Sequence, residues 1–110
     1  MNISTAFSAG RLTVYLTGEL DHHAARCAIH TIDELLDEYL PRDCVLDLNG
    51  LSFMDSSGIG VVLGRYRLLC LRGGSVALMH LTPQVRRIYD LSGMAQIIPV
   101  IEEKEAQGCN

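Results

Sequence analysis

The sequence predicts a single α/β domain over residues 1–110, with a mixed, mostly parallel sheet that opens with an N-terminal β-hairpin and is covered by helices on at least one face. Short apolar runs and segments of helical periodicity follow one another in the order β-β-α-β-α-β-α-β. A chain of 110 residues with 48% hydrophobic side chains suits one core. Aromatic residues make up only 5% and tryptophan is absent, which favours layered helices and sheet over an aromatic-rich barrel.

The opening hairpin is predicted from two β-prone runs, residues 2–7 and 11–17, separated by Ser8-Ala9-Gly10. The second run alternates polar residues with the apolar residues Leu12, Val14 and Leu16, so one of its faces lies on the core. A turn over residues 18–21 then leads into a helix, with Asp21 as a good N-cap.

The first helix is predicted over residues 22–39 and stops at Pro41. Its apolar stripe consists of Ala25, Ala28, Ile29, Ile32, Leu36 and Tyr39. On the opposite face, a possible row of metal ligands is formed by His23, Cys27, His30 and Glu34. We favour a solvated helix face over a metal site, because a ligand row without a closed shell is a weak signal.

Residues 44–48 have the mostly apolar character of a central parallel strand, and a second helix begins near Ser56. Gly73-Gly74 ends that helix, and residues 75–80 form the next strand. The adjacent helices suggest right-handed crossovers between parallel strands.

The last helix is predicted to begin with Thr82 as N-cap and Pro83 as its first residue, and to end before Gly93. Its inner side is expected to consist of Val85, Ile88, Tyr89 and Leu91. Residues 97–101 are predicted to form the final strand, and Pro99 favours a position at the edge of the sheet over a central one. The polar tail from Glu102 onward is expected to be a frayed helix at most.

Charge and composition argue against several kinds of partner. The net charge is −4 and the nine basic residues are scattered, so no basic stripe for nucleic acid is present. The N-terminus lacks the features of a signal peptide, and no apolar run is long enough for a membrane helix. We therefore expect a soluble, cytoplasmic protein without membrane contacts, in which Cys27, Cys44, Cys70 and Cys109 are reduced thiols.

The helix that begins near Ser56 carries three glycines, Gly58, Gly60 and Gly64, although each costs about 1 kcal/mol relative to alanine. The side chains expected to face the sheet are Ile59, Val62, Leu63, Tyr66 and Leu69, whereas Val61, Leu68 and Leu71 would point elsewhere. A helix that is apolar on more than one side is deeply buried or contacts a partner. Because glycine has no side chain, these positions would then let a partner approach the helix backbone closely.

No complete catalytic set is present, so we expect neither an enzyme nor a bound cofactor. The segment Asp55-Ser56-Ser57-Gly58 lacks the leading glycine of a hydrolase elbow. A phosphate-binding Walker motif is absent, and the glycine spacing differs from that of dinucleotide-binding loops.

The serine pair at the helix start has two interpretations. In the first, Asp55 or Ser56 simply caps the helix, and residue chemistry alone favours this role. In the second, a serine is phosphorylated, and the helix amides accommodate a charge of about −1.5 to −2. The added anion would repel a partner docked against Ile59 without changing the fold.

Three segments together resemble the STAS-domain anti-sigma factor antagonists, and most closely the branch that controls sigma-F in sporulation. They are residues 16–23 (LTGELDHH), 51–66 (LSFMDSSGIGVVLGRY) and 92–94 (SGM). The resemblance covers nearly the whole chain. It departs from the sporulation pattern at Leu68 and Leu71, where polar residues are common.

The resemblance implies a function in transcription regulation. Such a protein binds an anti-sigma factor that is also a serine kinase, and so releases the sigma factor. The kinase phosphorylates the antagonist, which then dissociates, and a separate serine phosphatase restores it. Ser56 corresponds to the phosphorylated serine, and Asp21 and Asp55 are expected to flank it. We expect a monomer that binds its partner through Gly18, Glu19, Asp21, Asp55, Ser56, Ser57, Gly58, Ile59, Gly60 and Val61.

Two alternatives stay open. The chain could be a STAS antagonist of another regulon, such as the general stress response. It could instead be a metal-binding or small enzymatic domain that uses His23, Cys27 and His30.

Overall fold

The computed structural model describes residues 1–101 and has the predicted α/β architecture. The elements are β1 (Asn2–Ser8), β2 (Arg11–Leu20), α1 (His22–Tyr39), β3 (Asp43–Met54), α2 (Ser56–Leu71), β4 (Ser75–Met79), α3 (Pro83–Leu91), the short 3-10 helix η1 (Met94–Gln96) and β5 (Val100–Ile101). The predicted order of strands and helices is therefore confirmed.

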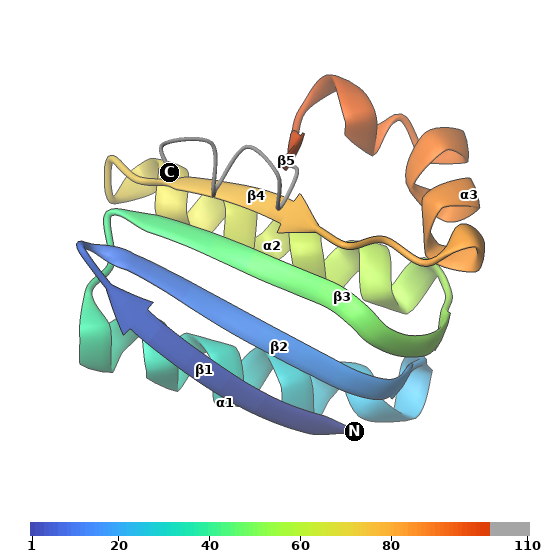
Figure 1. Ribbon diagram of the computed structural model, residues 1–110, viewed down its shortest axis with the longest axis horizontal. Helices are drawn as coiled ribbons and strands as arrows, with labels where there is room; N and C mark the ends of the chain where they lie inside the picture. Colours follow the sequence, from blue (N-terminus) through green and yellow to red (C-terminus); the bar gives the residue numbers. More distant parts are fainter. Residues whose placement is uncertain (102–110) are drawn as a thin grey trace, which may run out of the picture.

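The sheet has five strands in the order β1-β2-β3-β4-β5, as Figure 1 shows. β1 and β2 are antiparallel and all other neighbours are parallel, so the sheet is mixed as predicted. The hairpin turn consists of Ala9 and Gly10, both with positive φ, at 52° and 80°. Two successive positive φ angles match the twist of a tight two-residue hairpin.

The central strand β3 is longer than residues 44–48, the range that the apolar run predicts. It pairs with β4 only over residues 43–47, but it continues along β2 as far as Met54. Two register shifts, one after Tyr15 and one after Gly18, accommodate extra residues of β3. Bulges of this kind bend a strand and often lie beside functional sites.

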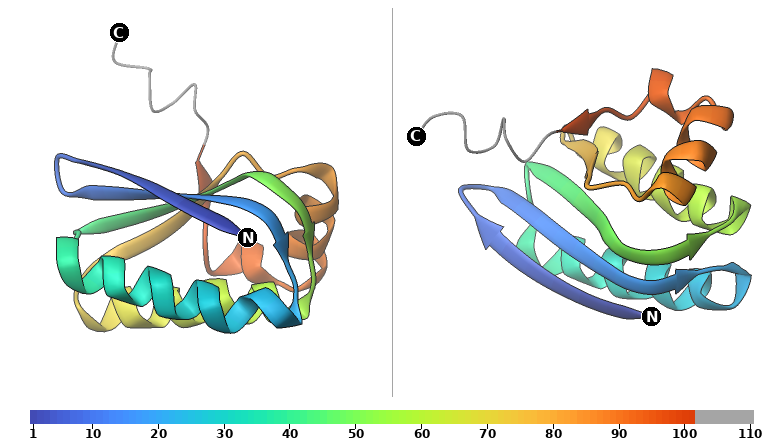
Figure 2. Two further views of the ribbon diagram at one scale, coloured as in Figure 1. Left: turned by 90° about the horizontal axis from the view of Figure 1, so that it is seen from below. Right: turned by 45° about the vertical axis from the view of Figure 1, so that its right-hand side comes forward.

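Helices α1 and α2 cover the same face of the sheet, as the left view of Figure 2 shows, and α3 lies at one end of the sheet (Figure 1). The helices and the sheet enclose one core. Its largest fully buried side chains are Leu12, Leu16, Leu20, Ile32, Leu36, Leu46, Leu48, Leu51, Met54, Leu69, Leu78 and Met94. Aliphatic residues and methionine thus build the core, as the composition predicts.

Helix α1 has the predicted bounds. The Asp21 carboxylate accepts a hydrogen bond from the Ala24 amide at 3.0 Å, so the predicted N-cap is confirmed. The helix ends at Leu40, which has a left-handed conformation directly before Pro41. Of the predicted stripe, Ala28, Ile32 and Leu36 are fully buried, and the other three residues, Ala25, Ile29 and Tyr39, are partly buried and pack against the core.

In α3 the N-cap prediction is confirmed, because Thr82 Oγ1 accepts a hydrogen bond from the Val85 amide at 3.4 Å. The prediction that Leu91 faces inward is wrong, because its side chain is 80% exposed. Tyr89, which is buried, donates to the Ile98 carbonyl at 2.6 Å. Leu91 lies about 200° further around the helix than Tyr89, and therefore points to the opposite side.

The final strand occupies the predicted sheet edge next to β4 but is shorter than residues 97–101. Ile97 and Ile98 belong instead to the turn after η1, where both amides donate to the Met94 carbonyl. The tail from Glu102 lies outside the described residues.

The structure also bears on the thiols and on membrane insertion. Cys27, Cys44 and Cys70 are free, whereas Cys109 lies outside the described residues. Burial raises the pKa of the Cys44 thiol to about 12.

Among residues 1–101, no helix combines the length and the apolar character needed to cross a membrane.

Candidate functional site

Two helix caps lie side by side at one edge of the sheet. Leu20 and Met54 are register partners at the ends of the parallel strands β2 and β3. Each is followed by an aspartate that caps a helix, and the Asp55 amide approaches the Leu20 carbonyl at 3.5 Å. The structure therefore brings the loops of Asp21 and Asp55 together, an arrangement that the family resemblance implies. The hydrogen bond from the Ala24 amide lowers the pKa of Asp21 below its usual value.

Asp55 accepts the hydrogen bonds of the free backbone amides in the first turn of α2. Its Oδ1 accepts a hydrogen bond from the Ser57 amide at 2.8 Å, and its carbonyl accepts from the amides of Gly58 at 3.0 Å and Ile59 at 3.3 Å. Ser56 is the first residue of the helix and is exposed, whereas Ser57 is half-buried. Of the serine pair, Ser56 is thus the more accessible to another protein.

The face of α2 that contacts the core includes the predicted side chains: Val62 and Leu69 are buried, and Ile59, Leu63 and Tyr66 pack against the core. It is wider than predicted, because Val61 and, in part, Leu68 also pack against the core. Val61 is only 1% exposed and belongs to the core, so the prediction that it points away from the sheet is wrong. The reason lies at Gly58, where an added Cβ would overlap the Met54 side chain and crowd Leu20. Gly58 therefore serves the packing of the helix on β2 and β3, and neither Gly58 nor Val61 offers a side chain to a partner.

The outer face of α2 carries the other two glycines. Gly60 is exposed, and an added Cβ at Gly60 or Gly64 would meet no atom within 4 Å. Leu71 on this helix is 86% exposed, as predicted for a residue that points away from the sheet. Ile59 is half-buried and packs against the core. Gly60 and Gly64 thus form a thin surface of α2, where no side chain covers the helix backbone. Ile59, in contrast, contributes to the packing of the fold.

The predicted residues Gly18, Glu19 and Asp21 line an open depression of about 550 Å³, together with Met1, His23, Ala24 and Cys27. Gly18 has φ of +113°, and an added Cβ would come within 3.3 Å of the Met1 Cα. Its carbonyl accepts a hydrogen bond from the Ser52 hydroxyl at 3.3 Å. The depression therefore extends the edge formed by the two caps onto the start of α1.

The row of possible metal ligands on α1 is exposed. His30 Nε2 lies 3.6 Å from the Glu34 carboxylate, with both side chains largely in solvent. Within residues 1–101, no three His, Cys, Asp or Glu side chains are grouped so as to hold a metal ion. The structure thus provides no support for the metal-binding alternative.

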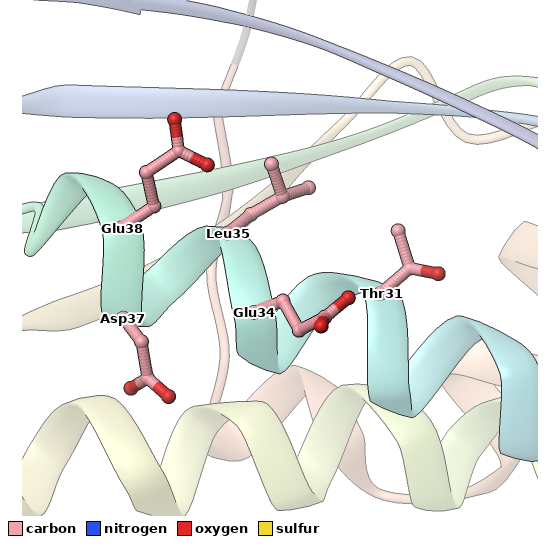
Figure 3. Close-up of a pocket in the computed structure, with 5 residues that line it drawn as sticks. All are labelled: Thr31, Glu34, Leu35, Asp37 and Glu38. Atoms are coloured by element: carbon pink, nitrogen blue, oxygen red, sulfur yellow. The ribbon is translucent and has the colours of Figure 1, made fainter.

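Figure 3 shows another depression, on the second half of α1, lined by Thr31, Glu34, Leu35, Asp37 and Glu38. Asp37 points toward α2 and forms an ion pair with Arg72 at 2.7 Å. The lining side chains come from a single helix, and its three charged members are all acidic. They therefore do not converge on a ligand, and the depression lies away from the helix caps at residues 21 and 55.

Three polar contacts between distant residues were missed by sequence reasoning. Gln84 makes two hydrogen bonds to the main chain of Met54. His80 Nδ1 lies 2.9 Å from the buried carboxylate of Asp47. Arg65 Nε forms an ion pair with the Asp33 carboxylate at 2.9 Å, but the geometry of this contact is not that of a hydrogen bond. Each joins residues about 30 positions apart, so no local pattern could reveal them.

Comparison with known proteins agrees with this architecture. Residues 2–107 match the STAS domain family. The chain is 39% identical over 104 residues to the anti-sigma F factor antagonist of Paenibacillus polymyxa, covering 94% of this chain and 89% of the relative.

Two solved structures of the antagonist SpoIIAA are also similar. The unphosphorylated form has a TM-score of 0.79 at 32% identity, covering 96% of this chain and 92% of that one. The phosphorylated form from Bacillus has a TM-score of 0.72 at 30% identity, covering 97% of both chains. The chain therefore belongs to the STAS domain family, in its branch of anti-sigma factor antagonists.

Proposed function

We propose that this protein is a partner switch controlled by phosphorylation of Ser56. The unphosphorylated form binds an anti-sigma factor that is also a serine kinase, and the sigma factor is thereby released. Phosphate transferred from ATP to Ser56 ends the binding, and a serine phosphatase restores it. The protein itself catalyses no reaction, and it acts as a monomer in the cytoplasm, where transcription takes place.

The observation that carries this proposal is the exposed position of Ser56 at the start of α2. Its hydroxyl makes no hydrogen bond to any other residue of the described part, so the fold does not depend on it. The amides of Ser57, Gly58 and Ile59 are already bonded to Asp55. These amides are therefore not free to donate hydrogen bonds to a phosphate on Ser56, and they would do little to stabilise its negative charge.

The same arrangement supports loss of binding after phosphorylation. The phosphate would add a charge of about −1.5 to −2 beside the Asp55 carboxylate. Like charges placed in an interface cost several kcal/mol in binding. We expect the partner to cover the depression at Gly18, Glu19 and Asp21 and the thin surface at Gly60, with Ser56 between them.

We assign the sigma-F regulon, since the relative at 39% identity is an anti-sigma F factor antagonist. An antagonist of another regulon, such as the general stress response, has the same fold. Competition between the anti-sigma factors of the two regulons for this protein, followed by calorimetry, decides between them, and we expect tighter binding to the anti-sigma F factor.

Calorimetric titration of the anti-sigma kinase with Ser56→Ala and Ser56→Asp tests the switch. We expect Ser56→Ala to bind like the wild type, and Ser56→Asp to bind about tenfold more weakly or worse, because of the added charge. Ser8→Asp adds the same charge at an exposed position at the other end of the hairpin, and it is the matched control that should bind like the wild type. Wild-type affinity of Ser56→Asp would contradict the proposal.

A further inference from the structure

The end of β3, directly before Ser56, is held by a side chain from a distant helix. β4 accompanies β3 only as far as Asp47, so the following residues of β3 have β2 on one side and, within residues 1–101, no strand on the other. At Met54, the last residue of β3, the side chain of Gln84 occupies the place of the missing strand. Gln84 is the second residue of α3.

Both main-chain groups of Met54 are bonded to this one side chain. The Met54 amide donates to Gln84 Oε1 at 3.1 Å, and Gln84 Nε2 donates to the Met54 carbonyl at 2.9 Å. A glutamine amide carries the same donor and acceptor pair as a peptide group, so it can complete a strand edge at two points. Gln84 is half-buried, which protects both bonds from competing water.

Met54 connects this contact directly to the serine switch. The next residue, Asp55, caps α2 and is bonded through its own amide to Leu20 on the opposite side. The Met54 side chain is 1% exposed and fills the space that Gly58 leaves open. Displacement of Met54 would therefore move the Asp55 cap and the first turn of α2 together.

We propose that Gln84 is a positioning residue for phosphorylation of Ser56. By holding Met54 from the side of α3, it keeps Asp55 and the Ser56 hydroxyl in one orientation for the kinase that transfers phosphate. This inference rests on the function proposed above. It adds that α3, which contributes no residue to the predicted docking surface, controls how well the serine is presented.

The test combines amide exchange with phosphorylation kinetics. Gln84→Leu has a similar size and loses both hydrogen bonds, whereas Gln84→Glu keeps an acceptor for the Met54 amide but loses the donor to its carbonyl. Gln96→Leu, at an exposed position of η1, is the matched control. All are compared well below their melting temperatures, so that the folded fraction is the same.

In Gln84→Leu we expect the Met54 and Ser57 amides to exchange about tenfold faster, while the amides of β1 and β2 stay protected. We expect kcat for Ser56 phosphorylation to fall about tenfold with little change in KM, because the hydroxyl is misaligned after binding. Gln84→Glu should keep the Met54 amide protected and lose part of kcat, and Gln96→Leu should behave like the wild type.

Unchanged exchange at Met54 and Ser57 in Gln84→Leu, or faster exchange with unchanged kcat, would overturn the inference. Exchange that rises equally over the whole sheet would show a general structural role and would also overturn it. If the wild type accepts no phosphate on Ser56, the proposed function fails, and with it the effect of Gln84 on phosphorylation; the exchange data would still decide whether Gln84 holds the end of β3.

Discussion

The Asp55 carboxylate accepts a hydrogen bond from the Ser57 amide at 2.8 Å, across the exposed residue Ser56. The cap of α2 and the proposed phosphorylation site are therefore adjacent, and a negative charge already stands at the helix start. Phosphate on Ser56 would meet this carboxylate instead of a set of free amides. The two interpretations of the Asp-Ser-Ser-Gly segment are thus compatible, because Asp55 caps the helix and leaves the Ser56 hydroxyl available.

Loss of the Asp55 cap should destabilise the protein. We expect Asp55→Ala to lower the free energy of unfolding by about 1 kcal/mol, because the Ser57 amide loses its partner. Asp55→Asn keeps a capping oxygen and should remain close to the wild type. Urea denaturation measures both variants, and equal stability of Asp55→Ala and the wild type would show that the cap contributes nothing.

The cap of α1 should make stability depend on acid pH. The pKa of Asp21 is lowered from its unfolded value of 3.8 by the Ala24 hydrogen bond. Its contribution is therefore present above the unfolded pKa, and is lost as the pH falls through the lower folded pKa. Asp21→Asn should reduce the dependence of the unfolding free energy on pH below about 4, measured by urea denaturation at several pH values. An unchanged slope would contradict this role of Asp21.

Two glycines of α2, Gly58 and Gly60, should respond differently to substitution. Gly60→Ala should raise the free energy of unfolding by about 0.5–1 kcal/mol, because the added methyl group meets open space in a helix interior. Gly58→Ala should lower it by about 1–3 kcal/mol, because its Cβ overlaps Met54. Thermal melting distinguishes the two.

A larger side chain at the same outer position separates stability from binding. Gly60→Gln should retain the stability of the wild type or exceed it, yet weaken binding to the anti-sigma kinase about tenfold by obstructing close approach. Calorimetry with the purified partner gives the affinity. Wild-type affinity would place the docking surface elsewhere.

The cysteines should differ in reactivity. Cys44 is 1% exposed and its pKa is raised to about 12 by burial, so almost no thiolate is present near neutral pH. Cys27 and Cys70 are exposed. Iodoacetamide at pH 8 should therefore modify these two in the native protein and modify Cys44 only after unfolding, as peptide mapping by mass spectrometry would show. Rapid modification of Cys44 in the native state would indicate local opening of the sheet.

Local signals predicted the helix caps well. Asp21, Thr82 and Asp55 are short polar residues directly before apolar periodic segments, and each accepts the expected amide hydrogen bond. The alternation from Leu12 to Leu16 likewise predicted the buried face of β2. Such features depend on neighbouring residues only, so the sequence contains them directly.

The full width of the buried face of α2 could not be predicted in this way. Its apolar residues lie on several sides, so periodicity alone leaves the inward face undetermined. The close approach of Gly58 to Met54 decides it, and turns Val61 into the core and Gly60 outward. The contact between Gln84 and Met54 was also hidden, since it joins residues 30 positions apart through a crossover that only the fold defines.

The central claim is that Ser56 receives the phosphate, and site mapping tests it most directly. The protein is incubated with ATP and its cognate anti-sigma kinase, and the phosphopeptide is sequenced by tandem mass spectrometry, with Ser56→Ala and Ser57→Ala treated in parallel. We predict phosphate on Ser56, none in Ser56→Ala, and continued incorporation in Ser57→Ala. Phosphate found only on Ser57, or no incorporation into the wild type, would contradict the proposed switch.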